Sequence, residues 1–154
     1  MQIISELIEA HIFRESNNGI EFLLLKRAES SIYPGLWQMV TGKINNKDEF
    51  AYKTALREIK EETGLVPEKF WVAPNINSFY DQQRDVISHL PVFACKVTSN
   101  SGVILSKEHC EFQWVKSEIA KNLLAWPGQK KSVDIITEYF SEDNSLLRFI
   151  EIML

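Results

Sequence analysis

The sequence predicts an α/β protein of the α+β kind, in which a mixed central β-sheet carries helices on both faces. Three observations support this prediction. Strand-like segments come first, one amphipathic helix follows them, and further strands precede a last helix. The chain has 154 residues, of which 45% are hydrophobic, so it suits one domain with a buried core. We therefore expect residues 1–154 to form a single domain.

The N-terminal part of the chain is expected to form three strands. Residues 2–13 show a partial alternation of apolar and polar side chains, which indicates a strand. Asn-Asn-Gly at 17–19 is a turn signal typical of hairpins, and the nearly continuous apolar run 20–27 predicts a strand buried on both faces. Pro-Gly at 34–35 marks a loop, after which residues 36–40 predict a short strand.

Residues 49–63 are expected to form the central helix. Asp48 can act as its N-cap, and Gly64 suits the left-handed residue that commonly follows a helix. An apolar residue recurs every four positions and defines the face that we expect to be buried: Ala51, Ala55 and Ile59.

The remaining residues predict three more strands and one more helix. Strand-like segments lie near 70–80, 87–97 and 111–115, and a helical pattern extends from about 128 to 139. Residues 146–154 are mostly apolar, but their spacing assigns them to neither a helix nor a strand.

Composition excludes several classes of function. The net charge of −4, with both signs spread along the chain, argues against binding of nucleic acid or an anionic membrane. No run approaches the ~18 apolar residues of a membrane span, and the N-terminus lacks the basic region of a signal peptide. Cys95 and Cys110 are too few for a disulfide framework. We expect a cytoplasmic protein with reduced thiols, whose oligomeric state, monomer or homodimer, the sequence leaves open.

Three glutamates of the central helix are candidate metal ligands. Glu58, Glu61 and Glu62 lie three and four positions apart, so they share one face and repel one another. A hard divalent cation with oxygen ligands would relieve that repulsion. For a glutamate-rich helix alone, a solvated surface is the more common explanation. The surrounding pattern decides between the two interpretations.

The segment from Gly42 to Leu65 resembles the Nudix box, Gly-x5-Glu-x7-Arg-Glu-U-x-Glu-Glu-x-Gly-U, where U is a bulky aliphatic residue. From Glu49 onward every fixed position matches, including Arg57 and Gly64. One departure precedes the helix, because six residues (43–48) rather than five separate Gly42 from Glu49. An insertion in a loop is tolerated and leaves the helical carboxylates unchanged.

The resemblance extends over roughly residues 3–140. A strand that ends in Lys26-Arg27, the Trp-Gln-x-Val-Thr-Gly segment at 37–42, the Glu108-His109 pair and Trp126 are most similar to the branch of dihydroneopterin triphosphate and dATP pyrophosphohydrolases. The resemblance implies a Nudix α/β/α sandwich. It also implies hydrolysis of a nucleoside or pterin triphosphate, or a related diphosphate-linked compound, to a monophosphate and pyrophosphate.

The family resemblance assigns roles to the acidic residues. Glu58, Glu61 and Glu62 would bind Mg²⁺, for which Mn²⁺ can substitute, and the metal would activate the attacking water. The general base would be Glu58 or Glu108, and Glu108 would otherwise be a further metal ligand. Among the neighbours of these residues, Arg57 would orient carboxylates. Gly42 and Glu49 would support the residues that bind the metal without being direct ligands themselves.

Four other residues are candidates for substrate binding. Arg27 and Lys43 would contact phosphates, and a plain surface charge is the alternative for each. Trp37 would stack on a base or pterin ring unless it is a core aromatic, and Tyr80 is a weaker candidate of the same kind.

Two alternative functions stay open at this point. A hydrolase of ADP-ribose or a dinucleoside polyphosphate would use the same carboxylates on another substrate. A non-catalytic Nudix module would sense a nucleotide without cleaving it. Such modules usually lose box carboxylates, whereas this chain keeps them, so the sequence favours the enzyme.

Overall fold

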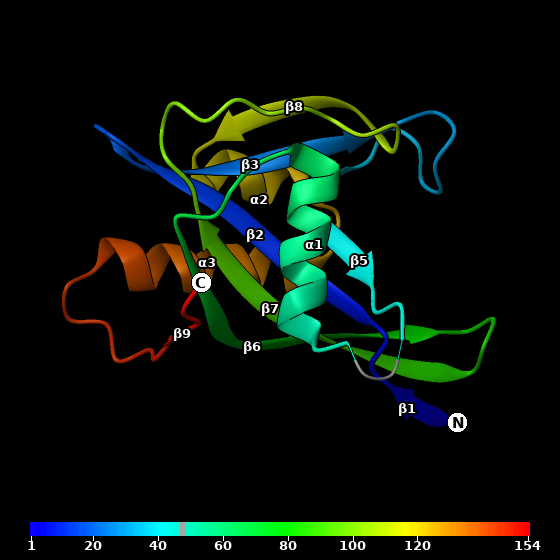
Figure 1. Cartoon of the computed structure of the whole chain (residues 1–154). Coiled ribbons are helices and arrows are strands. Elements are labelled where there is room, and N and C mark those ends of the chain that lie inside the picture. Colours follow the sequence, from blue (N-terminus) through cyan, green and yellow to red (C-terminus); the bar gives the residue numbers. More distant parts are fainter. Residues whose placement is uncertain (47–48) are drawn as a thin grey trace.

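The computed structural model describes residues 1–46 and 49–154 (Figure 1). Its strands are β1 (Gln2–Ile4), β2 (Leu7–Ser16), β3 (Gly19–Arg27), β4 (Trp37–Gln38), β5 (Val40–Lys43), β6 (Lys69–Asp81), β7 (Val86–Lys96), β8 (His109–Val115) and β9 (Ile150–Glu151). Its helices are α1 (Ala51–Thr63), α2 (Ser117–Leu123) and α3 (Pro127–Ser141).

The described strands join in one mixed sheet. The main path runs β4-β3-β2-β7-β6-β9, while β1 pairs with β7, β5 with β2, and β8 with β3. Strands β1 and β2 run parallel to β7, and the other pairs are antiparallel. The predicted mixed sheet is therefore confirmed.

Helices cover both faces of this sheet, as predicted. Residues of β2 alternate between two hydrophobic cores because successive side chains of a strand point to opposite faces. Ile8 packs in the core that contains Ile59 of α1, whereas Phe13 packs in the core that contains Val133 of α3. Figure 1 shows α1 on the near side of the sheet and α3 on the far side.

The strand predicted at residues 2–13 is two strands. Ile4 of β1 pairs with Ser88, but Glu9 of β2 pairs with Val92, so the register along β7 changes by one residue between them. The hydroxyl of Ser5 donates a hydrogen bond to the carbonyl of His89 at 3.0 Å, which holds the break against β7. Two more elements were not predicted, the short helix α2 and strand β9 in the apolar tail.

Helix α1 begins two residues later than predicted, after an extended Phe50. The predicted N-cap, Asp48, lies outside the described residues. Gly64 ends the helix as predicted, with a left-handed φ of 69° and its N–H bonded to the carbonyl of Lys60. In the described part of the chain, none of the helices combines the length and the apolar character needed to cross a bilayer.

Candidate active site

The three predicted carboxylates of α1 differ in their exposure. Glu62 is only 4% exposed, whereas 57% of the Glu61 side chain is accessible to solvent. The Glu58 side chain lies between these extremes at 14%. One helical turn therefore carries acidic groups from the core to the surface. The i, i+3 and i+4 spacing predicts that they lie on one side of the helix but not this difference in exposure.

Arg57 connects the acidic residues of the box. Its Nε donates to Oε1 of Glu49 at 3.1 Å, and its Nη1 donates to Oε1 of Glu58 at 2.8 Å and to Oε2 of Glu61 at 3.4 Å. Its Nη2 donates to the carbonyl of Lys43 at 3.2 Å. Arg57 thus contacts three carboxylates at once, and its role in orienting them for the reaction stays a prediction.

Gly42 is in direct contact with Glu58. A Cβ atom at Gly42 would lie 2.2 Å from Cγ of Glu58, which is far inside van der Waals contact. The short strand β5 therefore passes against α1 only because residue 42 has no side chain. The extra residue between Gly42 and Glu49 does not prevent this contact.

Glu108 reaches the same site through the loop before β8. Backbone N–H groups of that loop bind the last carbonyls of α1, from Ile104 to Thr63 at 2.8 Å and from Ser106 to Glu62 at 3.4 Å. These bonds satisfy carbonyls that a helix end leaves free. Burial is the main cause of the raised pKa of Glu58 and of Glu62, and the negative charge of Glu108 adds to both shifts. The predicted acidic residues are therefore brought together.

Glu62 has the most strongly shifted pKa of the acidic residues in the box. Burial, followed by the charges of Glu108 and Glu58, raises its pKa to about 9. Its Oε2 atom is buried and has no hydrogen-bond partner among the described residues. A divalent cation would provide that oxygen with a partner and remove the repulsion, so the donor set fits a hard cation.

The described acidic side chains are not arranged around a single position that a metal ion could occupy. Within residues 1–46 and 49–154, no group of three or more Asp, Glu, His or Cys side chains has the arrangement of a metal site. The hydrogen bonds explain this, because the carboxylates of Glu58 and Glu61 are turned toward the guanidinium of Arg57. Binding a cation would require the side chains of Glu58 and Glu61 to turn away from Arg57.

The predicted substrate-binding residues lie in different places. The charge of Arg27 counteracts part of the rise in the pKa of Glu62, which is caused mainly by burial, so Arg27 lies near that residue. Its Nε donates to the carbonyl of Ile32. Lys43 follows Gly42 on β5. Trp37 is partly buried and packs against the core under α2 and α3, and Tyr80 donates to Asp85 at 2.9 Å. Arg27 thus lies near the acidic cluster, whereas the side chain of Lys43 leaves β5 on the face opposite to Gly42 and Glu58. Trp37 is mainly a core residue.

A buried polar network on the other face of the sheet was not predicted. Glu9 and His11 are each 1% exposed, and Oε2 of Glu9 lies 3.0 Å from Nε2 of His11. Glu9 also accepts from Asn77 at 3.2 Å and from Ser132 of α3 at 3.0 Å. The signal available in the sequence was the pair of polar residues at alternate positions of an otherwise apolar strand.

His109, to which no chemistry was assigned, is buried beside the site. Its Nε2 lies 2.9 Å from Nε2 of Gln38, which joins the loop of Glu108 to β4. Burial, together with the charge of Arg27, lowers the pKa of His109 to about 4, so the ring is neutral near pH 7 and its Nε2 accepts from the amide. His109 therefore holds the loop of Glu108 in place.

Similarity to known proteins extends over most of the chain. The family described as NUDIX domain matches residues 8–135. The nucleoside triphosphatase NudI of Klebsiella pneumoniae (strain 342) is 25% identical over 113 residues, which are 69% of this chain and 79% of that protein.

Solved structures show the same fold. An Ap4A hydrolase from C. elegans has a TM-score of 0.74 at 21% identity and covers 88% of this chain and 96% of its own. The dihydroneopterin triphosphate pyrophosphohydrolase of E. coli has a TM-score of 0.70 at 18% identity and covers 86% and 94%.

Proposed function

This chain belongs to the NUDIX domain family, and from that premise we propose that it is a Mg²⁺-dependent pyrophosphohydrolase of a nucleoside or pterin triphosphate. The products would be a monophosphate and pyrophosphate. Residues 1–154 would act as one domain. The substrate is a small molecule, and neither nucleic acid nor a membrane takes part. We place the enzyme in the cytoplasm.

The observation that carries this proposal is the state of Glu62. A buried carboxylate with an unpaired oxygen and a pKa of about 9 is costly to maintain unless a cation or a reaction uses it. After burial, the negative charges of Glu108 and Glu58 raise this pKa further. Glu58, Glu61, Glu62 and Glu108 would hold the Mg²⁺, which supplies charge neutralisation at phosphate oxygens and a water of lowered pKa.

Other steps of the proposed reaction, namely proton transfer and phosphate binding, are assigned to side chains of the protein. Glu58 is the group that we propose as general base, because burial raises its pKa toward the working pH and Arg57 keeps its carboxylate oriented. Glu108 is the alternative base. Arg27, whose charge acts on Glu62, would bind phosphate oxygens at the acidic cluster, and Lys43 would bind them from the other face of β5.

A triphosphate is chosen as the substrate because the chain is 25% identical over 113 residues to a nucleoside triphosphatase. The E. coli neighbour of 18% identity contributes only the fold, so a pterin substrate rests on the sequence motifs described above. The alternative is a hydrolase of ADP-ribose or of a dinucleoside polyphosphate. The C. elegans Ap4A hydrolase has the same fold as this chain, so the fold does not decide between the two substrates.

A substrate panel tests the proposal. Purified protein with Mg²⁺ would be given common and oxidised nucleoside triphosphates, dihydroneopterin triphosphate, ADP-ribose and diadenosine polyphosphates, and the released phosphate species would be identified. We expect pyrophosphate from a triphosphate, and no turnover after chelation of the metal. Turnover of ADP-ribose or a dinucleoside polyphosphate alone would select the alternative. Metal binding without turnover of any compound would indicate a sensing module.

A further inference from the structure

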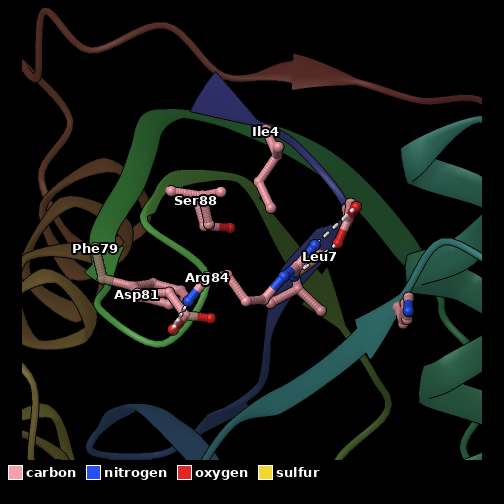
Figure 2. Close-up of a pocket in the computed structure, with 9 residues that line it drawn as sticks. Ile4, Leu7, Phe79, Asp81, Arg84 and Ser88 are labelled. Atoms are coloured by element: carbon pink, nitrogen blue, oxygen red, sulfur yellow. Dashed lines mark hydrogen bonds and ion pairs between the residues drawn. The ribbon is translucent and has the colours of Figure 1, made fainter. Parts of the chain in front are cut away.

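A small pocket lies on the far side of β5 from α1 (Figure 2). Its volume is about 110 Å³. It is formed where β1, β2 and β5 meet the β6–β7 hairpin, and it is lined by Ile4, Glu6, Leu7, Lys43, Phe79, Asp81, Arg84, Val86 and Ser88. In Figure 2 the side chain of Arg84 extends from the hairpin toward Leu7, while Ser88, Ile4 and Phe79 lie around the same space.

Ser88 gives the pocket an unused hydrogen-bonding group. The residue is 3% exposed, and its hydroxyl oxygen has no partner among the described residues. Buried polar groups without a partner are rare, because each one costs free energy relative to a hydrogen-bonded group. A hydroxyl that faces a pocket in this state is ready to bind a polar atom of a ligand.

Phe79 lies directly opposite Ser88 in the sheet and offers an apolar surface. The two residues are register partners on β6 and β7, so their side chains leave the sheet on the same face. Phe79 is 45% exposed, which leaves part of its ring open to contact. A hydroxyl beside an open aromatic ring suits a flat ligand that also forms hydrogen bonds.

The other end of the pocket is closed by an ion pair. The guanidinium of Arg84 donates to both oxygens of Glu6, at 3.1 Å and 3.4 Å, and the backbone N–H of Arg84 lies 3.4 Å from the carboxylate of Asp81. These contacts tie the segment between β1 and β2 to the tip of the β6–β7 hairpin. The N-terminal strand thus forms a wall of the pocket.

The pocket is one strand away from the acidic cluster. Lys43 lines it, and the carbonyl of the same residue accepts a hydrogen bond from Arg57. The preceding residue, Gly42, touches Glu58. A molecule that crosses the edge of β5 would therefore present its phosphates to the cluster and its opposite end to the pocket.

We propose that this pocket is the subsite that selects the substrate's ring, a flat heterocycle that contacts Phe79 and accepts or donates a hydrogen bond at the hydroxyl of Ser88. The ring is a nucleobase or a pterin, which share this chemistry. The inference rests on the proposed function, since it assigns the ring end of the same triphosphate. Lys43 lines the pocket and follows Gly42, which touches Glu58.

The test compares two serines on neighbouring strands. Ser88→Ala removes the hydroxyl in the pocket, and Ser78→Ala is the matched control, since Ser78 lies one residue before Phe79 and therefore on the opposite face. For the best triphosphate in the panel, we expect Ser88→Ala to raise KM about 5-fold and Phe79→Ala about 10-fold or more, with kcat nearly unchanged. Ser78→Ala should leave both constants unchanged.

A second measurement does not depend on catalysis. Binding of the matching nucleoside, or of free pterin, without metal or phosphate is measured by calorimetry on the wild type and the same variants. We expect weaker binding in Ser88→Ala and Phe79→Ala, and no loss of thermal stability in Ser88→Ala, because the removed hydroxyl has no partner in the described structure.

The two proposals fail in different ways. An enzyme that cleaves a triphosphate while Ser88→Ala and Phe79→Ala keep the wild-type KM and nucleoside affinity would overturn the ring subsite and leave the function intact. Loss of thermal stability in Ser88→Ala would assign Ser88 a structural role and overturn its part in binding. A protein that cleaves no phosphate compound yet binds a nucleoside in a Ser88-dependent way would overturn the function and keep the subsite.

Discussion

Gly42 shows how closely single residues of the site are packed. Because a Cβ atom there would lie 2.2 Å from Cγ of Glu58, a Gly42→Ala protein has to displace β5 or the carboxylate. We expect destabilisation of about 1–3 kcal/mol and a loss of activity, as is usual for added atoms in a packed region. Urea unfolding and turnover would measure the two effects.

Gly102→Ala is the control for that substitution. A Cβ atom at Gly102 meets nothing within 4 Å, so the same chemical change should leave stability and turnover close to those of the wild type. Equal behaviour of the two variants would show that the close approach of β5 and α1 is unimportant.

The carboxylates of α1 give a second prediction for single residues. Glu58→Gln and Glu61→Gln remove negative charge without changing shape, so we expect turnover to fall about 100-fold or more while the protein still folds. Glu68→Gln, an exposed glutamate after the helix, is the matched control and should be neutral. Wild-type turnover in both site variants would remove these residues from the proposed metal site.

Not every residue of the site could be predicted from local pattern. Helical spacing alone groups Glu58, Glu61 and Glu62. The position of Glu108 depends on backbone hydrogen bonds between its loop and the end of α1, which no local pattern encodes, and only the family resemblance indicated it. The rotation of carboxylates toward Arg57 is likewise a matter of packing and charge in three dimensions.

Among the elements, α3 is attached to the sheet by polar as well as apolar contacts. Glu9 of β2 accepts from Ser132 of α3, from Asn77 of β6, and lies in hydrogen-bond distance of His11. Glu9→Ala would leave these buried groups without their acceptor, so we expect destabilisation of about 3 kcal/mol or more. Denaturant unfolding monitored by circular dichroism would measure it.

Glu15→Ala is the control on the same strand. The side chain of Glu15 is 62% exposed and its ion pair with Lys96 lies at the surface, so its loss should cost well under about 1 kcal/mol. If Glu9→Ala is no more destabilising than Glu15→Ala, the network does not hold α3 on the sheet.

The elements also show where prediction from sequence reaches its limit. Helix α1 was predicted because it has a regular apolar stripe and a glycine at its end. Helix α2 has seven residues and buries only Ala120, so it has no stripe to detect. Strand β9 exists through pairing with Trp71 and Val72 of β6, which lie far away in the sequence.

For the molecule as a whole, the raised pKa of Glu62 couples folding, pH and metal. The folded protein without metal keeps a proton on Glu62 up to about pH 9, whereas the unfolded chain loses it near 4.5. Between these values the folded state binds more protons, so its stability falls as pH rises, by up to about 1.4 kcal/mol per pH unit. His109, whose pKa is lowered to about 4, acts in the opposite sense, but only below about pH 6.5.

Unfolding free energies measured from pH 7 to 8.5 in wild type and Glu62→Gln isolate the contribution of Glu62. In this range the folded His109 is neutral, and the smaller loss from Cys95, whose thiol pKa is raised by burial, is common to both proteins. Without metal, we expect the wild type to lose stability across the range, and Glu62→Gln to lose clearly less, since glutamine has no proton to release. With saturating Mg²⁺ the loss in the wild type should shrink, because the cation replaces the proton and stabilises the folded state more at the higher pH. Parallel pH profiles for wild type and Glu62→Gln without metal would mean that Glu62 is ionised in the folded protein, and the electrostatic basis for a cation at α1 would then be lost.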